Sequence, residues 1–338
     1  MRRRALLQHA ALLAPALAPV LATPALAQPG FPDRPISLVV PFTAGGSTDI
    51  AARILAERLA PRLGPNARIV VENRAGAGGS LGADHVRRQA PDGHVLLLAT
   101  ASSHATNPAA LPATTPYDPV GDFSHVAIIG GGPMVLVVPG RSPHRTLPDL
   151  FAAARARPGA LSFGTSGAGG IGHLTAEFVM FRGGGAAGPL KAEHIPYRGG
   201  AQVLAAMASG ELDFSVEVLA SAAPHVRDGT SRALAVTVPR RHPLFPDVPS
   251  VAEYGLTDVE ITTWNVLLAP RGLPPALLAR LNEAVGAALA EPALRERMAA
   301  AGVDAAQPST PDETRAFVAA ELAKFRAIVR DANIQLGR

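Results

Sequence analysis

Glycine, serine and threonine residues follow short apolar segments of this chain, where their backbone and hydroxyl groups could hold an anion. The first such loop, residues 42–49, contains Thr43-Ala44-Gly45-Gly46-Ser47. It lies between an apolar run of strand length and apolar residues at helical spacing. Such a loop leaves backbone N–H groups unpaired at the positive end of a helix, where a carboxylate or phosphate can bind. Asp49, near the helix start, is expected both to cap these groups and to contact a ligand.

A second glycine-rich loop, residues 164–172, partly resembles a nucleotide-binding motif. Gly167, Gly169 and Gly172 have the spacing of a dinucleotide-binding fingerprint. The acid that would bind a ribose should end the next strand, but Glu193 precedes that strand. The sequence contains no G-x-x-x-x-G-K-[ST] phosphate loop. These loops therefore favour a small carboxylate, and no cofactor is expected.

Catalytic and metal-binding roles are the alternatives for the same residues. Residues 164–168 approach a nucleophile elbow, but the final glycine is replaced by Ala168. A secreted hydrolase that uses Ser166 and His173 stays an alternative on this basis. His173 and Glu177 could share a metal across one helical turn, but no third ligand follows at a clear spacing, so no metal is predicted. Arg198 could bind a carboxylate in a forked geometry or lie solvated in its loop.

Strands alternate with helices along the chain, which predicts an α/β fold with a mostly parallel sheet. In such sheets, ligands bind beyond the carboxyl ends of the strands, where the Gly/Ser loops lie. Residues 104–125 are rich in proline and turn formers and are expected to be irregular. Thr310-Pro311-Asp312-Glu313 predicts a capping box that opens the last helix. The other strands and helices are expected at residues 68–72, 95–99, 134–138, 212–216, 233–238 and 261–269 (strands) and 81–89, 147–156 and 201–209 (helices).

The first 27 residues have the pattern of a cleavable signal peptide. Arg2-Arg3-Arg4 precede a mostly apolar stretch, and Ala25-Leu26-Ala27 forms a small-x-small cleavage site. Removal of this segment lowers the formal net charge from +4 to +1, because three arginines and no acids are lost. The low charge and dispersed basic residues argue against a nucleic-acid partner. With no cysteine in the chain, disulfides and thiolate catalysis are excluded. A periplasmic location is expected.

The order of these motifs resembles that of the tripartite tricarboxylate transporter receptors, the Bug or TctC-like family of extracytoplasmic solute-binding proteins. The resemblance covers essentially all of residues 31–335. The motifs that carry it are Phe31-Pro32-Asp33-Arg34-Pro35-Ile36, residues 41–49, residues 71–79, Pro91-Asp92-Gly93, Asn107-Pro108, Pro116-Tyr117-Asp118-Pro119, Gly164-Thr165-Ser166-Gly167, Tyr197-Arg198-Gly199, residues 246–251 and Trp264.

The resemblance implies a type II periplasmic-binding-protein fold, in which two crossover strands join two α/β domains. Domain 1 would contain residues 28–127 and 263–338, and domain 2 residues 128–262. A monomer would capture a small carboxylate in the interdomain cleft by flytrap closure and present it to a large and a small membrane subunit of a transporter. A receptor that presents its closed form to the outer domain of a sensor kinase is the alternative.

The family's ligand loops map onto sixteen residues here. They are Phe42, Thr43, Ala44, Gly45, Gly46, Ser47, Asp49, Gly78, Ser102, Thr165, Ser166, Gly167, Tyr197, Arg198, Gly199 and Glu217. Three nearby positions depart from residues common in the family. Ala168 and Gly170 stand in place of Asn and Ser, and Glu217 in place of Asp.

Overall fold

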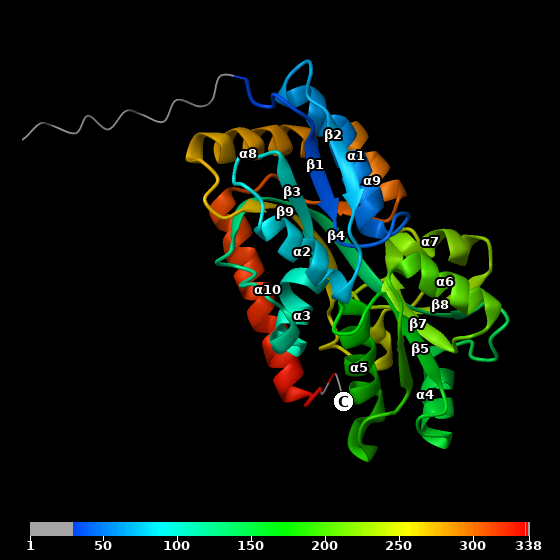
Figure 1. Ribbon diagram of the computed structural model, residues 1–338. Helices are drawn as coiled ribbons and strands as arrows, with labels where there is room; N and C mark the ends of the chain where they lie inside the picture. The colour runs from blue at the N-terminus through cyan, green and yellow to red at the C-terminus, as the bar shows by residue number, and fades with distance from the viewer. Residues whose placement is uncertain (1–29, 335, 337–338) are drawn as a thin grey trace, which may run out of the picture. The chain divides into compact units, whose positions relative to one another are not determined.

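The computed structural model describes residues 30–334 and 336 (Figure 1). The predicted signal peptide lies outside these residues. The strands are β1 (Ile36–Val40), β2 (Ile69–Asn73), β3 (Val95–Thr100), β4 (Phe123–Pro139), β5 (Ser162–Thr165), β6 (Glu193–Pro196), β7 (Phe214–Val218), β8 (Ser231–Val236), β9 (Thr262–Pro270) and β10 (Asp304–Ala305). The α-helices are α1 (Ser47–Leu63), α2 (Ser80–Arg87), α3 (Asn107–Ala110), α4 (Leu147–Ala156), α5 (Ile171–Gly184), α6 (Gly200–Ser209), α7 (Leu219–Arg227), α8 (Pro275–Leu289), α9 (Pro292–Ala300) and α10 (Pro311–Asp331).

The strands form two parallel groups that are joined through β4 and β9. The sheet order is β2-β1-β3-β9-β4-β7-β5-β6, and β8 and β10 also pair with β4. Strands β2, β1 and β3 are mutually parallel, as are β7, β5 and β6. The two connecting strands run antiparallel to their neighbours. The carboxyl ends of the parallel strands carry the loops that the sequence singled out, which confirms the predicted α/β architecture.

Strand β4 is longer than predicted and passes from one part of the sheet to the other. Its residues up to Pro133 pair with β9, and its residues from Met134 pair with β7 and β8. The expectation of an irregular chain over residues 104–125 was therefore wrong at both ends. A short π-helical turn covers Ser102–Thr106, α3 follows it, and β4 begins at Phe123. Three consecutive glycines at 130–132 hid this strand from pattern analysis, because only the pairing with β9 and β10 makes them extended.

Strand β3 is buried on both faces, as its apolar sequence predicts. Leu96 and Leu98 pack in one hydrophobic cluster with Leu55 and Leu59 of α1, whereas Leu97 packs in a second cluster on the opposite face. This alternation follows from the two-residue period of a strand. Helix α10 lies along α3 and β4 (Figure 1). Strands β1, β3, β5 and β7 are mostly buried in the same way, so the loops that follow them extend from the core.

The predicted capping box at the start of α10 is confirmed. Thr310 Oγ1 accepts a hydrogen bond from the Glu313 backbone N–H at 3.2 Å, and Glu313 Oε2 accepts one from the Thr310 N–H at 2.8 Å. Thr310→Ala is expected to lower the free energy of unfolding by about 1 kcal/mol, because the N–H of Glu313 loses its acceptor. Urea unfolding measures this loss. Thr310→Ser keeps a cap hydroxyl and should retain most of the free energy of unfolding. Equal losses in both variants would show that the cap hydroxyl is not what stabilises the helix start.

Candidate functional site

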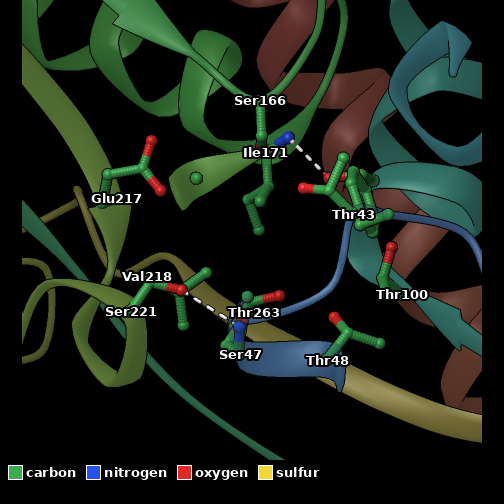
Figure 2. A pocket seen from close by; sticks show the side chains of 14 residues that line it. Thr43, Ser47, Thr48, Thr100, Ser166, Ile171, Glu217, Val218, Ser221 and Thr263 are labelled. Carbon is green, nitrogen blue, oxygen red and sulfur yellow. Dashed lines mark hydrogen bonds between the residues drawn. The ribbon is translucent and has the colours of Figure 1, made fainter. Parts of the chain in front are cut away.

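A small cavity lies where loops from both groups of strands meet (Figure 2). Its volume is about 40 Å³, room for roughly two or three water molecules. The lining residues come from the start of α1, the end of β3, β9, the starts of α5, α6 and α7, and the end of β7. They are Phe42, Thr43, Gly46, Ser47, Thr48, Thr100, Ser102, Ser166, Ile171, Gly200, Glu217, Val218, Ser221 and Thr263. Eight of these fourteen carry a hydroxyl group and none is basic, so the cavity is polar without a cationic side chain.

Four helices begin at this cavity, and none of them has a side-chain cap. The N-cap residues of α1, α5, α6 and α7 are Gly46, Gly170, Gly199 and Val218, and none of these side chains accepts a hydrogen bond from its helix. Among the helices that begin elsewhere, α4 and α10 have complete capping boxes, whereas α2, α8 and α9 also lack a side-chain cap. The four helix starts direct backbone N–H groups and the positive ends of four helix dipoles toward one space. This arrangement favours a negatively charged occupant.

Hydroxyl groups join these helix starts across the cavity. The Ser47 N–H at the start of α1 donates to Ser221 Oγ of α7 at 3.0 Å, and the Ile171 N–H of α5 donates to Ser102 Oγ at 3.0 Å (Figure 2). In each pair a hydroxyl oxygen occupies the position that a ligand oxygen could take. Each hydroxyl also keeps its own proton for donation. The cavity can therefore donate hydrogen bonds from both backbone and side chains.

Glu217 is the one ionisable side chain among the residues that line this cavity. Its side chain points into the space that Thr43 and Ser221 also face (Figure 2). The residue is 3% exposed, and burial raises the pKa of its carboxyl to about 8, although the Ser215 hydroxyl partly counters this. Its position at the end of β7 agrees with the sequence prediction of an acid near the site.

A second, larger cavity of about 410 Å³ shares Phe42 and Ser166 with the first. It contains four of the predicted ligand residues that the small cavity lacks. These are Gly78, Gly167, Tyr197 and Arg198. Arg198 is exposed, and its side chain is available from solvent. The predicted site is thus divided between a small polar cavity and a wider adjoining one.

Asp49 holds the loop that precedes α1 and lines neither cavity. Its carboxylate accepts hydrogen bonds from the Gly45 N–H, from Arg53 and from Asn73, all at 3.0 Å. Burial alone would raise the pKa of Asp49, but these hydrogen bonds outweigh burial and lower it. Asp49 is therefore ionised, and its hydrogen bonds hold the backbone of the 42–49 loop in place. Its direct contact with a ligand stays a prediction.

The other four predicted residues that line neither cavity have structural contacts instead. Ala44 and Gly45 lie within the first loop. The Thr165 hydroxyl lies 2.6 Å from His194 Nε2, so it faces its own half of the sheet. Gly199 is packed against Thr43, and a Cβ at Gly199 would overlap the Thr43 hydroxyl. These residues position the loops, and their ligand roles stay predictions.

The residues named for catalysis do not form a nucleophile–base pair in the structure. His173 Nδ1 accepts a hydrogen bond from the Gly169 N–H at 3.2 Å, and its ring stacks on His194 with centroids 3.5 Å apart. No hydrogen bond joins His173 to Ser166 among the described residues. His173 Nε2 and Glu177 Oε1 lie 3.8 Å apart. Within residues 30–334, no group of three or more potential metal ligands is found.

Seven lining residues were missed by sequence reasoning. They are Thr48, Thr100, Ile171, Gly200, Val218, Ser221 and Thr263. Val218 and Ser221 could have been found, because they follow an acid at the end of a predicted strand and open helix α7. Thr263 had no such signal, because it reaches the cavity only through the pairing of β9 with β4.

Comparison with known proteins identifies the family. Residues 51–334 match the Tripartite tricarboxylate transporter family receptor (TctC) family. The chain belongs to this family. It is 35% identical over 308 residues to protein BugT of Bordetella pertussis, with 90% of this chain and 91% of BugT covered.

Solved structures of family relatives share the fold and contain bound acids. R. palustris Rpa4515 with adipate has a TM-score of 0.84 and 32% identity, with 90% of this chain and 99% of that chain covered. MatC (Rpa3494) from Rhodopseudomonas palustris with bound malate has a TM-score of 0.83 and 30% identity, with 88% and 100% covered. The similarity to periplasmic binding proteins confirms the type II periplasmic-binding-protein fold.

Membership in this TctC family establishes a periplasmic solute receptor. The family consists of binding proteins rather than enzymes. None of the helices in the described part of the chain is long and apolar enough to cross a membrane.

Proposed function

We propose that this TctC-family chain captures a small organic acid in the 40 Å³ cavity and delivers it to a tripartite tricarboxylate-type transporter. The observation that carries the proposal is the convergence of four uncapped helix starts on a cavity lined by hydroxyls. Relatives with bound malate and adipate support a carboxylate as the anion. The cavity's size suits one carboxylate group, and the adjoining 410 Å³ cavity offers room for the rest of a longer acid.

Capture would proceed by closure of the two halves over the acid. In the structure, Gly167 lies so near Gly78 that a Cβ at Gly167 would be 2.9 Å from the Gly78 Cα. Gly199 approaches Thr43 in the same way. Such close approaches between loops of different halves support a closed form. Closure would replace water around the acid with backbone and hydroxyl donors, and a membrane partner would select the closed surface.

We propose that residues 28–127 and 263–338 form one domain of the flytrap and residues 128–262 the other. The change of β4 from β9 to β7 and β8 at Pro133–Met134 supports a boundary near this point. Residues 1–27 would direct export and be removed. The same capture could serve the outer domain of a sensor kinase, and the membrane partner distinguishes these two roles.

A ligand panel tests the proposed function. Thermal shift and calorimetry of the mature chain with acetate, malate, adipate, citrate and aspartate should show stabilisation by at least one acid, because a bound ligand stabilises the folded state. Saturating ligand should raise the free energy of unfolding by about 3 kcal/mol at a hundredfold excess over Kd. Failure of all acids, together with turnover of an ester that depends on Ser166 and His173, would favour the hydrolase instead.

The single tryptophan provides an independent readout of closure. Trp264 lies on β9, is 3% exposed and donates a hydrogen bond from Nε1 to Glu321 Oε2 at 2.9 Å. Because β9 would be a crossover strand, we expect its emission to change when a bound acid is added. A Glu321→Gln variant serves as a control that alters the indole's partner without touching the cavity. An unchanged emission with an acid of proven binding would place Trp264 away from the hinge.

A further inference from the structure

Glu217 is buried in the 40 Å³ cavity with almost no polar partner. Its Oε1 atom lies 3.3 Å from the Ser215 hydroxyl, which is its one hydrogen-bond partner among the described residues. Its Oε2 atom approaches Gly200, where a Cβ would lie only 2.6 Å away. An ionised carboxylate in such a place would lack compensation for its lost water.

The Ser215 hydroxyl has one proton, and that proton has a better acceptor. Ser215 Oγ lies 2.8 Å from the Gly164 carbonyl oxygen, to which it donates. Ser215 can give its one proton to only one acceptor at a time, and its contact with Glu217 Oε1 is the longer of the two. An ionised Glu217 therefore receives little compensation from Ser215, which favours the protonated carboxyl. Burial also raises the pKa of Glu217, which favours the protonated form as well.

Among residues 30–334, no other charged side chain lines the cavity that the Glu217 carboxyl faces. The neighbouring strand β4 presents Val135 in register with it, and α6 and α7 present Gly200 and Ser221. Titratable groups on α1, α5 and β6 have partners of their own. Asp49 of α1 is held by Arg53, His173 of α5 stacks on His194, and His194 of β6 contacts Thr165. A carboxylate ligand would thus meet Glu217 without an intervening cation.

We propose that capture of an acid in this cavity takes up one proton, which Glu217 holds, so that the site accepts carboxylates that carry no ammonium group. The inference rests on the proposed function, because it concerns the same ligand site. Protonated Glu217 can donate a hydrogen bond to the acid, whereas ionised Glu217 would repel it. In this way Glu217 acts as a specificity-determining residue beside the neutral donors.

Because binding of the acid and protonation of Glu217 are coupled, the affinity for the acid depends on pH in a defined direction. In an open, solvated form Glu217 has the ordinary glutamate pKa of about 4.3. In the closed form burial raises that pKa to about 8, and a bound anion would raise it further. At a pH between these two pKa values, the ligand-bound form holds one proton more than the open form. The affinity for the acid therefore falls as pH rises, by up to about tenfold per pH unit.

Calorimetry tests the inference with malate and adipate between about pH 6.5 and pH 9, where both acids are fully ionised. Titrations in buffers of different ionisation enthalpy should show uptake of close to one proton per bound acid. Glu217→Gln should lose the pH dependence of the affinity and take up no proton on binding. The exposed Glu211→Gln serves as the matched control and should behave as the unmodified chain.

Three results would overturn the inference. Acid binding without proton uptake would contradict it while leaving the proposed function intact. Tight binding of aspartate that Glu217→Gln abolishes would show an ionised Glu217 paired with an ammonium group. A pH slope that persists in Glu217→Gln would assign the proton to another group. Absence of binding by every acid in the panel would instead contradict the proposed function itself, and this inference with it.

Discussion

Replacing Gly131 with alanine is expected to lower the free energy of unfolding by about 3 kcal/mol or more. Gly131 lies in β4 where this strand pairs with β9, opposite Trp264. A Cβ at Gly131 would overlap the Thr263 carbonyl oxygen and lie 3.0 Å from the Trp264 Cα. These are backbone atoms, so they can move only if the pairing of the two strands is disturbed. Chemical denaturation followed by circular dichroism measures the loss.

Gly286→Ala is the matched control for this effect. Gly286 lies within α8, and a Cβ there would have its nearest neighbour, Pro308 Cβ, at an ordinary 3.5 Å. Alanine should be neutral or stabilising by up to about 1 kcal/mol at this position, because it favours the helix over glycine. If Gly131→Ala destabilised the protein by less than about 1 kcal/mol, the close pairing of β4 with β9 would be contradicted.

Gly200→Val is expected to weaken binding of the captured acid by at least about a hundredfold, which corresponds to about 2.7 kcal/mol. Gly200 opens α6 and lines the 40 Å³ cavity. Its Cβ would lie 2.6 Å from Glu217 Oε2 and 3.7 Å from Ser221 Cβ. The two methyl groups of valine would therefore fill the space meant for the carboxylate and press on Glu217. Calorimetry with malate and adipate measures the affinity.

The neighbouring residue on the same helix provides the control for that substitution. Ala201 is exposed, so Ala201→Val adds the same kind of side chain outside the cavity. Affinity in Ala201→Val should remain close to that of the unmodified chain, and both variants should unfold cooperatively. If Gly200→Val bound acids normally, the ligand would have to lie elsewhere, for example in the adjoining cavity that contains Tyr197 and Arg198.

Local sequence determined the elements whose signals lie within a few residues. The 42–49 and 164–172 loops follow strands and open α1 and α5, because an apolar run, small residues and helical spacing occur in direct succession. The capping box at Thr310 was read from four consecutive residues and is present. The order of such motifs along the chain was also enough to name the family.

Tertiary structure alone decided the length of β4 and the composition of the cavity. The glycines at 130–132 weaken any local strand signal, and their extended form comes from pairing with β9 and β10, which follow more than a hundred residues later. Thr263 reaches the cavity through the same pairing of β9 with β4. The proton on Glu217 also follows from tertiary contacts, because the sequence shows an acid but not its burial or its lack of partners. The burial of Glu217 and its lack of partners both depend on residues that are distant in the sequence, so no local pattern predicts them.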